Sequence, residues 1–81
     1  MYSGDNISGD FARAILSAAA NYQKTNGSLP NDVTLTVYSP VTGQDYQVSY
    51  SDDGTNTTAY NVTSGVSQNN MVVFPDSLLT G

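Results

Sequence analysis

The hydrophobic period of this sequence changes once, near residue 30, and that change restricts the folds the chain can adopt. Before it, Phe11, Ile15, Ala18 and Tyr22 recur at spacings of four, three and four, so they share one stripe of a helix. After it, from Val33 onward, apolar and polar residues alternate, as in strands with one buried face. The sequence therefore predicts a single long helix followed by strands.

The predicted helix has clear end signals. Asp10 or Ser8 can act as its N-cap, because either side-chain oxygen can accept a hydrogen bond from a free backbone N–H. At the other end, Asn26-Gly27 offers a residue for the left-handed conformation, and Pro30 prevents further helix. Residues 1–9 are rich in Gly, Asp and Asn, so we expect a flexible lead-in there and a single small domain over residues 10–81.

Four strands are expected, in the segments 33–39, 45–51, 57–64 and 71–74. Asp53-Gly54 predicts a hairpin with a tight primed turn. Tyr46 and Tyr50 of the second segment, and Thr58, Tyr60 and Val62 of the third, are expected to face the core. The tail after Pro75 is expected to form one helical turn or an apolar flap. The expected fold is α+β: one N-terminal amphipathic helix packed on a four-stranded antiparallel β-meander.

The small size of the chain suggests association. A domain of 81 residues buries only about 60% of the surface that its unfolded chain exposes. The sequence contains neither Cys nor His, so disulfides and the usual zinc ligands are absent. Because small domains without such supports usually gain stability from partners, we expect a homo-oligomer or a subunit of a host lattice.

The charge balance excludes several classes of partner. All seven acidic residues are Asp, only Arg13 and Lys24 are basic, and the net charge is −5. Binding to a nucleic-acid backbone needs Lys and Arg, so we expect no nucleic-acid partner. No apolar run approaches the roughly 20 residues of a membrane span. The surface is rich in Ser, Thr, Asn and Gln, which is typical of extracellular, cell-surface and virion proteins, and we expect such a location.

The residues needed for catalysis are scarce. There is no His, Cys or Glu, the serines have no evident base to activate them, and no glycine-rich phosphate loop follows a strand. Asp52 and Asp53 are adjacent on a turn and should point apart rather than act as a pair. We therefore expect no enzyme activity and no cofactor.

The segment 49–64 has two alternatives to a plain hairpin. Asp52 and Asn56 stand at alternate positions, as in a calcium loop, but no Glu is present to complete the ligand set, so a hairpin turn is favoured over a metal site. Asn56 and Asn61, like Asn6 and Asn26, also begin Asn-x-Ser/Thr triplets, so glycosylation is a further alternative in a secretory setting.

A surface of uncharged polar residues is the candidate interface. It consists of Thr34, Thr36, Tyr38, Gln47 and Asn61. Low-charge faces of this kind suit protein interfaces, because little charge must be desolvated when they are covered. The patch is expected to contact a neighbouring subunit or a carbohydrate.

The run "ARAILSAAANYQKTNGSLP" resembles the second half of the long helix in type IV pilins and type II pseudopilins. In that family an Ala-rich amphipathic helix ends in Tyr, Asn-Gly and Pro, here Tyr22, Asn26-Gly27 and Pro30, and leads into an antiparallel sheet. The resemblance implies a filament subunit. The apolar first half of the pilin helix is replaced here by "MYSGDNISGD", and the cysteine pair of many pilins is missing.

Together these patterns favour a non-catalytic structural protein that acts through protein–protein packing. It is expected to be a pilin-like filament subunit or a small virion component, such as a capsid decoration or tail protein. The alternative is a small binding module, phage-encoded or surface-encoded, that inhibits one host protein.

Overall fold

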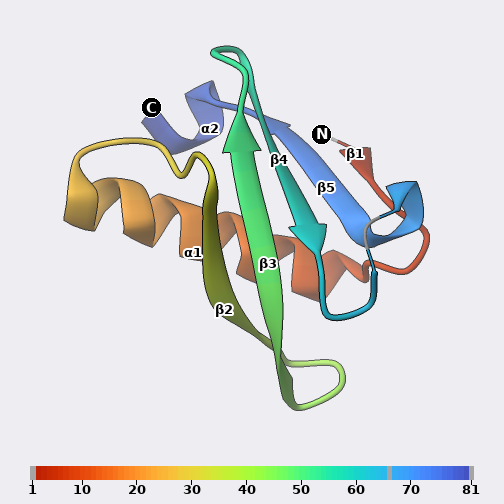
Figure 1. Ribbon diagram of the computed structural model, residues 1–81. Coiled ribbons are helices and arrows are strands. Elements are labelled where there is room, and N and C mark those ends of the chain that lie inside the picture. Colours follow the sequence, from red (N-terminus) through yellow and green to blue (C-terminus); the bar gives the residue numbers. More distant parts are fainter. Residues whose placement is uncertain (1, 66, 81) are drawn as a thin grey trace.

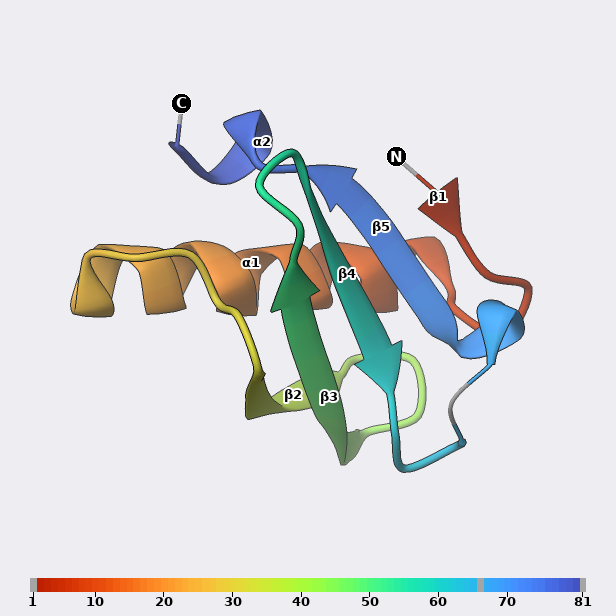
Figure 2. The same cartoon turned by 45° about the horizontal axis from the view of Figure 1, so that its top comes forward.

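The protein folds into two layers, a helix and a sheet. The computed structural model describes residues 2–65 and 67–80. Helix α1 (Gly9–Asn26) lies across one face of an antiparallel sheet (Figures 1 and 2). The strands are β1 (Tyr2–Ser3), β2 (Val33–Ser39), β3 (Gln44–Asp52), β4 (Asn56–Asn61) and β5 (Met71–Pro75). They stand in the order β1-β5-β4-β3-β2. The expected α+β class and the β2–β5 meander are confirmed, with one additional strand.

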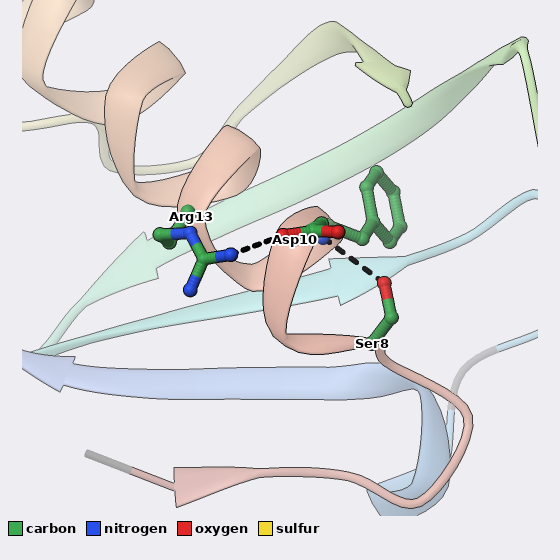
Figure 3. A network of polar contacts seen from close by, with 4 residues as sticks. Ser8, Asp10 and Arg13 are labelled. Atoms are coloured by element: carbon green, nitrogen blue, oxygen red, sulfur yellow. Dashed lines mark hydrogen bonds and ion pairs between the residues drawn. The ribbon is translucent and has the colours of Figure 1, made fainter. Parts of the chain in front are cut away.

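Local sequence signals determine both ends of α1. Of the two candidate N-caps it is Ser8 that acts, with its Oγ accepting a hydrogen bond from the backbone N–H of Phe11 at 3.1 Å (Figure 3). Asp10 instead forms an ion pair with Arg13, one turn further along. At the C-terminal end Gly27 adopts the left-handed conformation (φ 74°), and its N–H donates to the carbonyl of Gln23 at 2.8 Å.

The core lies between α1 and the inner face of the sheet. Small residues of the helix let its backbone approach the strands, while larger side chains from both layers fill the remaining space. From α1 and the turn before it come Ile7, Phe11, Ala12, Ile15 and Ala19. From the sheet come Val37, Val48, Tyr50, Ala59, Val72 and Phe74.

Tyr50 links the two layers by a polar contact inside this core. Its hydroxyl donates to the backbone carbonyl of Ile15 at 2.8 Å, so the buried O–H has a partner. Burial also raises the pKa of Tyr50 far above its usual value. The tyrosine therefore stays neutral and fixes the position of α1 over β3.

The β3–β4 hairpin is confirmed, but Asp53-Gly54 is not the centre of a type I′ turn. A type I′ turn needs positive φ at both central residues, and here Gly54 has a φ of 95° whereas Asp53 does not have a positive φ. The Asp53 carboxylate instead accepts the backbone N–H groups of Thr55 at 2.9 Å and Asn56 at 2.8 Å. The bonds from Asn56 and then Thr55 lower the pKa of Asp53.

The prediction that Thr58, Tyr60 and Val62 face the core is wrong. Strand pairing places Ala59 opposite Tyr50 and Val72, so Thr57, Ala59 and Asn61 point inward. Large side chains on the two neighbouring strands already occupy the space beneath β4, and the small Ala59 fits between them. Tyr60 is therefore half-buried on the outer face, and Val62 is exposed beyond the end of β4.

Residues 2–8, expected as part of a flexible lead-in, form a strand and a turn against the sheet, so that five strands are present rather than four. Tyr2 and Ser3 pair with Val73 and Val72 of β5. The backbone N–H of Gly4 donates to Met71 at 2.9 Å. Ile7 is buried and packs in the core. The apolar Ile7 thus anchors a segment whose composition alone suggests a flexible chain.

The C-terminal region continues this packing. A 3-10 turn (Gln68–Asn70) precedes β5, and the short helix α2 (Ser77–Thr80) follows it. Leu79 packs against the core whereas Leu78 is exposed. The expected helical turn is thus confirmed. No helix in the described part of the chain has both the length and the apolar character to cross a membrane.

Candidate functional site

Four of the five predicted interface residues lie together on the outer face of the sheet, away from α1. Thr34, Thr36 and Tyr38 come from β2, and Gln47 comes from the adjacent β3. Gln47 lies opposite Thr36 across the strands, and its Nε2 donates to the Thr36 hydroxyl at 3.1 Å. Tyr38 is 56% exposed. We call these four residues the hydroxyl patch. The four side chains are uncharged and their polar groups are accessible, and the exposed Asp45 borders them opposite Tyr38.

Asn61, the fifth predicted residue, is not part of this surface. It lies on the inner face opposite Val48 and is only 5% exposed. Its Nδ2 donates to the hydroxyl of Ser64 at 3.2 Å, while its Oδ1 meets no donor among the described residues. The sequence placed Asn61 outward for the same reason that it placed Tyr60 inward: the register of β4 is shifted by one residue relative to the hydrophobic pattern.

The other half of the outer face is more apolar, and sequence reasoning missed it. Tyr60 lies opposite Met71, and Val73 lies opposite both Thr58 and Tyr2. Tyr60, Met71 and Val73 are half-buried and Tyr2 is 46% exposed. The available signal was the run "MVVF", because a strand without polar alternation is typical of one covered on both faces. This apolar half adjoins the hydroxyl patch across β3.

Two depressions accompany these surfaces. The larger, about 360 Å³, is an open groove between the second half of α1 and β2, and we call it the edge groove. The smaller, about 120 Å³, lies near the start of α1. The edge groove is lined by Ala18, Asn21, Tyr22, Thr25, Asn26, Leu35 and Thr36. The smaller pocket is lined by Asn6, Ser8, Phe11, Ser39, Val41, Thr42, Tyr46, Asn61 and Ser64.

Neither depression has a charged side chain in its lining. The serines of the smaller pocket include Ser8, whose hydroxyl caps α1, and none of the described residues that line this pocket carries a carboxylate, amine or imidazole. Such linings offer hydroxyl and amide hydrogen bonds together with apolar contact.

The acidic residues lie mainly at the hairpin end of the sheet. Hydrogen bonding with Asp76 raises the pKa of Asp52, and partial burial adds to the effect. Asp76 in turn accepts a hydrogen bond from the Thr57 hydroxyl at 2.7 Å. Within residues 2–65 and 67–80, no group of three or more acidic side chains converges as a metal site requires. These carboxylates are bound to the turn and to one another.

Comparison with protein-family models, with curated proteins and with solved structures found no match. The resemblance of the helix ending to pilins therefore stays a prediction. Arguments about function rest on the two halves of the outer face and on the edge groove.

Proposed function

We propose that this chain is a non-catalytic assembly subunit that works by packing its uncharged surfaces against other protein subunits. The observation that carries the proposal is the hydroxyl patch: four accessible, uncharged side chains on one face of a protein whose net charge is −5. One carboxylate, that of Asp45, borders the patch opposite Tyr38, and the four patch side chains themselves carry no charge, so covering them desolvates little charge.

The thin core gives a further reason for association. A single helix covers one face of the sheet, and the other face has no covering layer within the described residues (Figure 2). That face carries half-buried apolar side chains, Tyr60, Met71 and Val73, beside the hydroxyl patch. A second layer supplied by a neighbouring subunit would remove this apolar surface from water.

The expected setting is an extracellular filament or a virion. The pilin-like helix ending favours a filament subunit, and the low-charge surface fits either setting. In both, the same chain packs against many copies of itself or against a host lattice, and no bound cofactor is required.

The proposal is tested by measuring the mass of the purified chain in solution over a wide concentration range, by sedimentation velocity and light scattering. We expect a reversible increase in mass with concentration. A chain that stays monomeric to millimolar concentration, and that binds neither filament nor capsid preparations, would overturn the proposal and favour the alternative of a binding module for one host protein.

A further inference from the structure

One edge of the sheet is open. β2 is the last strand of the sheet, and it pairs only with β3. Among the described residues, no backbone hydrogen bond joins residues 33–38 to any element on the other side. A free strand edge presents a row of unpaired N–H and C=O groups that can bind another strand.

This edge lacks the features that normally prevent such pairing. Native edge strands are commonly protected by charged side chains, Pro, bulges or very short length. β2 has seven residues, and none of them is charged or Pro. Asp32 and Pro40 lie just outside its two ends, so they bound the free edge without interrupting it.

The edge groove extends this open surface. Leu35 and Thr36 point to opposite faces of the sheet, yet both line the groove, so the groove reaches the free edge of β2 itself. On the inner side it is bounded by Ala18 and Tyr22 of α1. A strand added beside β2 would therefore gain backbone hydrogen bonds, and its inward side chains would enter a partly apolar depression.

The sequence of β2 is complementary to itself. When two copies run antiparallel and are centred on Thr36, Leu35 of one copy lies opposite Val37 of the other, and Thr34 lies opposite Tyr38. Inward residues thus meet inward residues and outward residues meet outward residues, as a continuous sheet requires. Only this centre pairs all seven residues. Tyr–Thr pairs across neighbouring strands are favourable.

Charge also favours a second copy at this edge. Each chain carries a net charge of −5, so two copies repel each other at most approaches. The β2 edge is uncharged, and in the register centred on Thr36 the acidic Asp32 meets Pro40 rather than another acid. The edge is therefore a place where two like-charged copies can meet with little repulsion.

We propose that two copies of this chain pair their β2 strands antiparallel about a two-fold axis at Thr36, which joins their sheets and merges their edge grooves. The axis runs perpendicular to the sheet, so both α1 helices lie on the same face and their Tyr22 side chains approach each other across the joined grooves. This contact deepens the proposed assembly function and rests on it. It leaves the outer faces of both copies free for further packing.

A cysteine placed at the axis tests the geometry directly, because the natural sequence contains no Cys. In an antiparallel pair the Cα atoms of directly opposite residues are roughly 4.5–5.5 Å apart, within the range that a disulfide spans. Under mild oxidation, Thr36→Cys should form a covalent dimer at least tenfold faster than Gln47→Cys. Gln47 also faces outward and lies directly opposite Thr36 but one strand further in, so its two copies would be about 14 Å apart.

Charged variants test the same contact in solution. Thr36→Asp places two carboxylates opposite each other at the axis, whereas Gln47→Asp adds the same charge to the same patch one strand away. We expect Thr36→Asp to raise the dimer dissociation constant at least tenfold and Gln47→Asp to change it less than threefold. Circular dichroism of both variants checks that the fold is retained.

The outcomes separate this inference from the proposed function. If the natural chain assembles while Gln47→Cys crosslinks as fast as Thr36→Cys and the two Asp variants behave alike, the assembly uses the outer face and the β2 pairing is wrong. If the natural chain stays monomeric at all concentrations, both proposals are overturned. Rapid crosslinking of Thr36→Cys together with the selective effect of Thr36→Asp supports the paired strands.

Discussion

The two edges of the sheet differ in how completely the chain covers them. At one edge, β1 pairs with β5, and the turn after β1 lies against the 3-10 turn Gln68–Asn70 (Figure 1). The backbone N–H groups of Gly4 and Asn6 donate to Met71 and Asn69 at 2.9 and 2.8 Å. At the other edge, β2 carries seven residues with no covering element beyond them among the described residues.

The difference shows that the N-terminal segment protects only one of the two edges of the sheet. β1 has just two residues, so it ends the sheet with a very short strand, which is a common way of preventing further pairing. Asn70 holds the same region together from inside. The protected edge is therefore expected to contribute to the stability of the single chain, and the open edge to association.

The largest effect is expected from Gly4→Ala at the protected edge. A Cβ at this position would lie 2.5 Å from the backbone carbonyl oxygen of Asn69, closer than real Cβ contacts allow, so backbone must move. We expect the free energy of unfolding in urea to fall by about 3 kcal/mol.

Gly9→Ala is the matched control, because its Cβ would meet no atom closer than Arg13 Nη1 at 3.9 Å. It should be neutral or stabilising by less than about 1 kcal/mol. Equal losses in both variants would show that Gly4 is not tightly packed.

Much of the fold follows from local signals in the sequence. The helix is predictable because its apolar spacing, the N-cap and Gly27 all agree, and strands β2 to β5 follow from alternation and turn residues. The first strand is not predictable, because two residues carry no period and their partner β5 is almost 70 residues away. The faces of β4 were misassigned because hydrophobicity favours placing Tyr60 inside, while the pairing of Ala59 with Tyr50 decides the register.

The location of the candidate interface could also be predicted in part from the sequence. Alternation along β2 places Thr34, Thr36 and Tyr38 on one face, and the predicted Gln47 lies beside them, opposite Thr36. Their role as an interface stays a prediction. Asn61 could not be placed correctly without the strand register. The expected meander places both β2 and β5 at edges, and the sequence did not show that only the β2 edge stays open, because the pairing of β1 with β5 is a long-range property.

Asn70→Ala is expected to have the second largest effect. Asn70 is buried, its Nδ2 donates to the carbonyls of Gly65 at 2.9 Å and Ser64 at 3.3 Å, and its Oδ1 accepts from Asn6 at 3.0 Å. Removing the amide leaves buried groups without these bonds, so the free energy of unfolding should fall by about 2 kcal/mol. The exposed neighbour provides the control: Asn69→Ala should cost less than about 0.5 kcal/mol. A loss below about 0.5 kcal/mol for Asn70→Ala would contradict this account of the protected edge.

A smaller and pH-dependent effect is expected at the β3–β4 hairpin, which belongs to neither edge. The raised pKa of Asp52 means that its ionised form is disfavoured in the folded chain. The contribution of the protonated side chain to the free energy of unfolding is therefore lost as the pH rises through that pKa. The lowered pKa of Asp53 has the opposite effect on stability. The ionised carboxylate contributes to the free energy of unfolding at neutral pH, and this contribution is lost as the pH falls.

Two substitutions separate these contributions. Asp52→Asn should be more stable than the natural chain at about pH 7 and lose that advantage toward about pH 3, whereas Asp53→Asn should be less stable at about pH 7 and approach the natural chain at acid pH. Asp53 is exposed and Asp52 is only half-buried, so the changes should be smaller than that of Asn70→Ala. Urea midpoints at several pH values measure them. Parallel pH profiles for the two variants would refute the opposite signs.

The smallest effect on stability is expected at the open edge. Thr34 is exposed on β2, and lysines are common on native edge strands. At concentrations where the chain is monomeric, Thr34→Lys should therefore change the free energy of unfolding by less than about 0.5 kcal/mol. In the paired strands, however, Thr34 lies opposite Tyr38 of the second copy, so the same substitution should weaken association. A variant that loses more than about 1 kcal/mol as a monomer would show that β2 already stabilises the single chain, and the difference between the two edges would disappear.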